Sequence, residues 1–98
     1  MFARVSSYQG EVERLVDGFR RTTEPLMQLE GFERAYFLTD TEAGRALTIT
    51  LWDSQAAMEA SADWASKARE HAAHDSNATI ESVRSYEVAL TAEKPAMR

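Results

Sequence analysis

The chain contains no cysteine, and this absence removes several kinds of chemistry at once. A disulfide framework, a thiolate nucleophile, an iron–sulfur cluster and a cysteine-rich zinc site are all excluded. The only two histidines, His71 and His74, lack the His-x-x-x-His spacing of a helical zinc site. Glycine-rich phosphate loops and the Ser-x-Gly elbow of hydrolases are also missing. Any chemistry must therefore come from other side chains.

Basic residues and long apolar runs are also in short supply. Lys and Arg number 11 against 16 Asp and Glu, so the formal net charge at pH 7 is −5. Without a basic stripe to bind phosphates, nucleic acid is not an expected partner. No run approaches the roughly 18 apolar residues of a membrane span, and no secretion signal opens the chain. We therefore expect a cytoplasmic protein with no membrane partner.

Side-chain periodicity predicts strands and helices in alternation. Alternating residues predict strands over 2–8, 32–40, 46–52 and 79–90. Apolar residues at i, i+3, i+4 and i+7 from Val12 predict a helix whose apolar stripe continues past a proline to about residue 31. A second, alanine-rich helix is expected to start after a cap at Asp53 or Ser54 and to run to about 74, with a break near 61–63, where the weak helix formers Ser61 and Asp63 flank an alanine.

The order β-α-β-β-α-β predicts an α+β, ferredoxin-like domain: a four-stranded antiparallel sheet with its helices on one face. We assign it to residues 1–92 and expect 93–98 to be a flexible tail. The strands also carry apolar residues toward the opposite face, such as Phe37 beside Tyr36 and Trp52 beside Leu51. A second copy packed sheet to sheet would cover that face, so a homodimer is expected.

Several segments resemble the antibiotic biosynthesis monooxygenase family of dimeric α/β barrels. The main one is the strand over 46–52 that ends in Trp-Asp-Ser and runs into a helix with Ala57 and Met58. Residues 1–5, 30–32 and 86–88 are also similar, so the likeness extends over about residues 1–90. The resemblance implies a cavity between helices and sheet in each protomer, and a barrel formed by two sheets across the dimer.

The resemblance also implies an activity that needs no cofactor. In such oxygenases a small phenolic or hydroquinone-like aromatic is deprotonated, and its anion reacts with dioxygen directly. That chemistry needs an apolar slot, a proton acceptor, and a donor or cation for the anion. Two alternatives stay open: a haem-degrading monooxygenase, and a dimeric module, binding or stress-associated, that kept the fold without the chemistry.

Candidate residues exist for each of these roles. We expect His71 or His74 to be the base, because only histidine has an unperturbed pKa near 6.5, and Arg84 to hold the anion. The break in the second helix decides which histidine faces the cavity. The expected substrate-binding side chains are aromatic: Trp52, Trp64, Tyr36 and Tyr86.

In the haem alternative, Trp64 and His74 resemble the tryptophan and the haem-ligating histidine of haem-degrading relatives. The expected first-strand asparagine is replaced by serine at both positions where it would lie, Ser6 and Ser7. Each candidate also has a structural reading, because aromatics pack in cores, arginines pair with carboxylates, and histidines stabilise helix C-termini.

Overall fold

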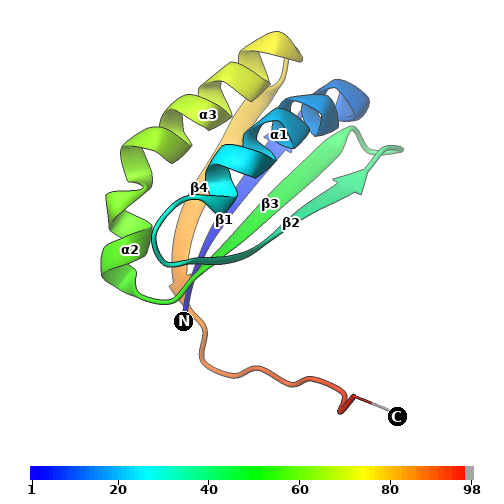
Figure 1. The fold of residues 1–98 in the computed structure, drawn as a ribbon. Helices are drawn as coiled ribbons and strands as arrows, with labels where there is room; N and C mark the ends of the chain where they lie inside the picture. Colours follow the sequence, from blue (N-terminus) through cyan, green and yellow to red (C-terminus); the bar gives the residue numbers. More distant parts are fainter. Residues whose placement is uncertain (97–98) are drawn as a thin grey trace.

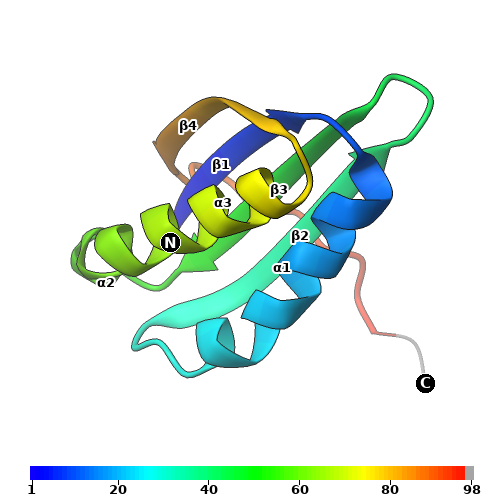
Figure 2. The ribbon, with the colours of Figure 1, turned by 90° about the horizontal axis from the view of Figure 1, so that it is seen from above.

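The computed structural model describes residues 1–96 and has the ferredoxin-like α+β architecture expected from the sequence (Figure 1). The elements in chain order are β1 (Phe2–Gln9), α1 (Val12–Met27), β2 (Phe32–Asp40), β3 (Arg45–Trp52), α2 (Gln55–Ala60), α3 (Ala62–Asp75) and β4 (Thr79–Glu87). All strand pairs are antiparallel, in the order β2-β3-β1-β4. The helices cover one face of the sheet, and the other face is bare (Figure 2).

The predicted break in the second helix is confirmed and falls at Ser61, between α2 and α3. The Ser54 hydroxyl caps α2 by accepting a hydrogen bond from the Ala57 amide at 3.1 Å. At the other end of α2, the Ser61 hydroxyl donates to the Met58 carbonyl at 2.7 Å. Because the Ser61 side chain satisfies a carbonyl at the end of α2, α3 can begin there in a new direction.

Two apolar clusters fill the space between helices and sheet. In the first, the rings of Tyr8 and Phe19 lie 5.1 Å apart, and Phe19 stacks on Phe37 at the same distance. In the second, Trp52 is fully buried beside Leu26. The helix-facing side of β1 therefore extends from one apolar cluster, at Tyr8, to the other, at Phe2.

A bulge in β4 changes which side chains share a face. Tyr8 pairs with Ile80, but the next residue back, Ser7, pairs with Ser82, so β4 carries one extra residue at this point. The alternation of a strand over 79–90 predicts that Ile80, Arg84 and Tyr86 share one face. The structure contradicts this prediction: Ile80 packs toward the helices, whereas the register places Arg84 and Tyr86 on the bare face.

Among residues 1–96, no helix is both long and apolar enough to cross a membrane. The last strand ends at Glu87, three residues before the predicted end. The tail predicted over 93–98 lies partly outside the described residues, since these stop at 96.

Candidate functional site

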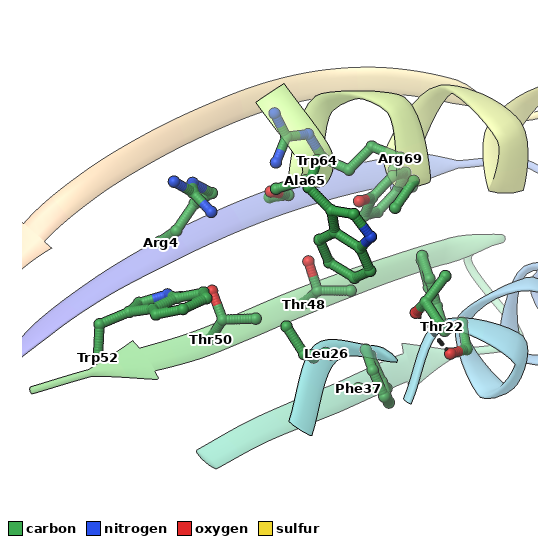
Figure 3. Close-up of a pocket in the computed structure, with 14 residues that line it drawn as sticks. Arg4, Thr22, Leu26, Phe37, Thr48, Thr50, Trp52, Trp64, Ala65 and Arg69 are labelled. Carbon is green, nitrogen blue, oxygen red and sulfur yellow. Dashed lines mark hydrogen bonds between the residues drawn. The ribbon is translucent and has the colours of Figure 1, made fainter. Parts of the chain in front are cut away.

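A cavity of about 50 Å³ lies between the helices and the helix-facing side of the sheet (Figure 3). Much of its wall is apolar and aromatic, with Phe19 and Leu26 from α1, Phe37 from β2 and Trp52 from β3. Trp64 extends from α3 toward Thr48, across the middle of the space (Figure 3). A flat apolar slot bounded by rings suits an aromatic ligand.

The floor of the cavity carries hydroxyl groups from neighbouring strands. Ser6 and Thr48 are paired across β1 and β3, and Tyr8 lies on the same side of β1. Tyr8 is only 1% exposed, yet its hydroxyl is without a hydrogen-bond partner in the part of the chain that is described. Burial raises the pKa of Tyr8, and the charge of Arg69 and the neighbouring hydroxyls of Thr48 and Ser6 oppose that rise, although neither hydroxyl has the geometry of a hydrogen bond to Tyr8. Tyr8 therefore keeps an unpaired hydroxyl buried next to the cavity.

Two arginines contribute positive charge. Arg4, 7% exposed, donates to the Ser61 hydroxyl at 3.1 Å and to the Met58 carbonyl at 2.7 Å, and its guanidinium carbon lies 5.9 Å from the centre of the Trp52 ring. Burial lowers the pKa of Arg4, and the nearby charge of Arg69 lowers it further. Within residues 1–96, neither guanidinium has a carboxylate within 4 Å.

The described lining contains no carboxylate and no histidine. An apolar cavity with two unneutralised cations favours an anion, because charges in a low-dielectric site interact strongly. The side chains of the cavity therefore suit an aromatic ring that carries negative charge on an oxygen.

A wider groove of about 400 Å³ lies between α1 and α3 and adjoins this cavity. The cavity and the groove share Thr22, Trp64 and Ala68, so these residues form the boundary between them. His71 and Lys67 line the groove beyond that boundary. Only these shared residues separate the groove from the Trp64 side of the cavity.

The structure brings only some of the predicted site residues together. Trp52 and Trp64 line the cavity, and His71 lines the adjoining groove. His74 lines neither: its side chain is 89% exposed, and Nδ1 lies 3.6 Å from the Asp75 carboxylate. Of the two histidines, His71 is the one near the site.

Tyr36, Arg84 and Tyr86 lie on the bare face of the sheet, away from the cavity, which corrects the location predicted for them. Tyr36 is 43% exposed, and its hydroxyl accepts a hydrogen bond from Arg34 at 3.0 Å. For Arg84 and Tyr86 the reason is the β4 bulge. For Tyr36 it is strand parity, because its register partner Ile49 also points to the bare face.

Sequence reasoning missed Tyr8 and Arg69 as site residues. A signal existed for each. Tyr8 shares its strand parity with Arg4, and Arg69 lies four residues after Ala65 on the same side of the helix. No group of three or more His, Asp or Glu side chains within residues 1–96 is placed to hold a metal ion.

Comparison with known proteins agrees with this fold. The family model for antibiotic biosynthesis monooxygenases matches residues 1–74. That is more than half of the 98 residues, so the chain belongs to the antibiotic biosynthesis monooxygenase family. No curated protein sequence gives a significant match.

Similar solved structures include proteins with different chemistry. SnoaB, a cofactor-independent oxygenase from Streptomyces nogalater, has a TM-score of 0.68 at 16% identity, over 95% of this chain and 97% of that chain. The heme-degrader MhuD from Mycobacterium tuberculosis, with two hemes in its active site, has a TM-score of 0.62 at 22% identity, over 95% and 100%. NE2512 of Nitrosomonas europaea, a protein of unknown function, has a TM-score of 0.73 at 15% identity, over 98% and 95%. At these identities the likeness establishes the fold alone.

Proposed function

We propose that the protein is a cofactor-independent monooxygenase that oxidises a small phenolic or hydroquinone-like aromatic in the cavity between its helices and its sheet. The observation that carries the proposal is the composition of that cavity. Aromatic and aliphatic walls surround Arg4 and Arg69, and no carboxylate or histidine is in the described lining. Such a site binds a flat ring and stabilises its anion, which is the state that reacts with dioxygen.

The reaction balances without an added reductant. A hydroquinone ionises at one hydroxyl, and the electron-rich anion transfers electrons to dioxygen. One oxygen atom ends on a ring carbon and the other leaves as water, so one hydroquinone and one dioxygen give one hydroxyquinone and one water. All four electrons come from the substrate, and the phenolic proton ends in the water. The chain's own tasks are to bind the ring, hold the anion and exclude bulk water.

The cavity volume restricts the substrate. About 50 Å³ is well below the few hundred Å³ of pockets that hold drug-sized molecules. A single ring enters if the Trp64 indole turns toward the groove, with which it is already in contact. The site thus favours a one-ring substrate over a polycyclic one.

Haem degradation, the other activity of similar folds, fits these residues poorly. The cavity is far smaller than a porphyrin, and His74, the predicted ligand, points to solvent beside Asp75. His71 lines the groove, outside the cavity. We therefore assign no step to haem.

We further propose that the protein works as a homodimer joined through the bare sheet face. Tyr36, Leu38 and Tyr86 are large side chains exposed on that face, at 43%, 46% and 51%. A single domain seldom leaves such a patch uncovered. Pairing two sheets would bury it and would leave each cavity on the outside of its own sheet.

Oxygen uptake tests the proposed activity. The purified protein, free of added metal or flavin, is mixed in an oxygen electrode with a panel of one-ring hydroquinones and, as a polycyclic comparison, anthrones. We expect uptake above the rate without protein, saturating with substrate and faster with the one-ring compounds. Tight binding of these aromatics with no uptake would instead support the non-catalytic binding module.

A further inference from the structure

The hydroxyl of Tyr8, a residue of the cavity lining, has no hydrogen bond that accounts for its burial. Its oxygen is fully buried and is without a partner in the described chain, and Tyr8 is one of the residues that line the cavity. A buried hydroxyl without a hydrogen bond destabilises the folded state. A group kept at that cost inside a cavity is explained if a ligand supplies its partner.

Arg69 lies close enough to act on the same point. Arg4, Tyr8 and Arg69 all line the same cavity, and the charge of Arg69 acts on the other two. Figure 3 shows the Arg69 side chain extending from α3 over Ala65 in the direction of Arg4. Arg4 already donates to Ser61 and Met58, whereas Arg69 has no hydrogen bond or ion pair to a side chain among residues 1–96. Arg69 is therefore the more available cation.

We propose that the Tyr8 hydroxyl and the Arg69 guanidinium, with Arg4 behind them, form an oxyanion subsite that binds a phenolic ring through its ionised oxygen. This inference rests on the proposed function and names the state in which the substrate is bound. The phenolic proton leaves to solvent through the groove, and no protein base in the cavity takes it. Tyr8 donates its hydrogen to the phenolate oxygen, and the two arginines supply the countercharge.

The charged groups around the subsite all favour the ionised form of a bound phenol. β1 contributes Arg4 and Tyr8, and α3 contributes Arg69. The parts of α1, β2 and β3 that line the cavity carry no titratable side chain. A cation within about 4–6 Å of an acid lowers its pKa by about one to three pH units. The subsite therefore replaces the histidine base expected from the sequence.

The ionisation of a coloured phenol tests this proposal directly. 4-Nitrophenol absorbs at longer wavelength when ionised, so an absorbance titration of the protein–probe complex gives the apparent pKa of the bound probe. We expect this value to fall by about one pH unit or more on binding, and nitrobenzene, which lacks the hydroxyl, to bind at least about tenfold more weakly. An unshifted value, or no saturable binding of the probe, overturns the proposal.

Variants identify the responsible groups. In Arg69→Met we expect most of the pH shift to be lost, and in Arg69→Lys most of it to be kept. Tyr8→Phe is expected to weaken probe binding about fivefold or more, because one charge-assisted hydrogen bond is lost. Arg20→Met removes an exposed arginine paired with Asp17 and should change neither measurement. Circular dichroism confirms that each variant is folded, and equal shifts in wild type, Arg69→Met and Tyr8→Phe would overturn the assignment.

The outcome is separable from that of the oxygenase proposal. A shifted probe without oxygen uptake on the phenol panel supports the subsite and contradicts the oxygenase activity. Oxygen uptake with an unshifted probe does the reverse, because catalysis would then ionise the substrate by another route.

Discussion

Replacing Tyr8 by phenylalanine should stabilise the fold while weakening the site. The ring of Tyr8 packs 5.1 Å from that of Phe19, and phenylalanine keeps this contact. Only the hydroxyl is removed, and it lies buried without a partner in the described chain. Since an unpaired buried hydroxyl costs about 1–3 kcal/mol, we expect Tyr8→Phe to raise the free energy of unfolding by about 1 kcal/mol.

Urea unfolding and thermal melting measure this change. For a domain of this size, 1 kcal/mol corresponds to a rise of about 4–8 °C in Tm. Tyr86→Phe is the matched control, because Tyr86 is 51% exposed and its substitution should stay within about 0.5 kcal/mol of wild type. A Tyr8→Phe variant less stable than wild type by 1 kcal/mol or more would refute the reasoning, since the hydroxyl would then be paired.

The same tyrosine predicts a pH dependence. Burial raises the pKa of folded Tyr8 above its ordinary value of 10.0. The folded state therefore holds this proton more tightly than the unfolded chain, and the stabilisation is fully present below pH 10 and lost as the pH rises above it. We expect the stability of wild type to fall more steeply above pH 10 than that of Tyr8→Phe. Parallel curves for the two proteins would contradict the burial argument.

Three further predictions concern the dimer, a turn and haem. Ile49→Lys, at the centre of the bare sheet face, should convert a dimeric mass in light scattering to a monomeric one, whereas a monomeric wild type would exclude the dimer. Gly31→Ala should lower the free energy of unfolding by about 1–3 kcal/mol, because φ is +78° and the new Cβ would meet Asp53 Oδ1 at 2.6 Å. Gly44→Ala, also at positive φ but with only an ordinary contact of 3.5 Å to the Gly10 carbonyl oxygen, should cost less in the same denaturation assay. Haem titration should give no saturable Soret shift, and a shift abolished by His71→Ala would reverse the assignment of the cofactor.

Sequence periodicity was sufficient for the fold because each element carries its own signal. The apolar spacing from Val12 indicated α1, and the weak helix formers around Ser61 indicated the break between α2 and α3. The alternating residues over 2–8 indicated β1, on whose helix-facing side Arg4 and Tyr8 lie. The location of Arg84 could not be predicted, because a bulge inserts one residue into β4 without a clear sequence signal and reverses the faces beyond it.

The candidate site was predicted less completely, for reasons of geometry. Trp52 and Trp64 were placed correctly in the cavity because both their own element and its packed face could be inferred. The histidines were chosen for their chemistry, but the direction of α3 beyond Ser61 decides what they face. It turns His74 to solvent and leaves His71 in the groove. Tyr8 is a candidate because its buried hydroxyl lacks a hydrogen-bond partner in the described chain. The absence of a partner can be seen only in a three-dimensional structure.

Isotope labelling tests the central claim most directly. The purified protein, without added metal, flavin or haem, is incubated with the best hydroquinone of the panel under labelled dioxygen, and the product is analysed by mass spectrometry. The account predicts one labelled oxygen atom in each product molecule and one in water, with the rate reduced about tenfold or more in Arg69→Met. An unlabelled quinone, or a labelled product that forms equally fast without the protein, would contradict it.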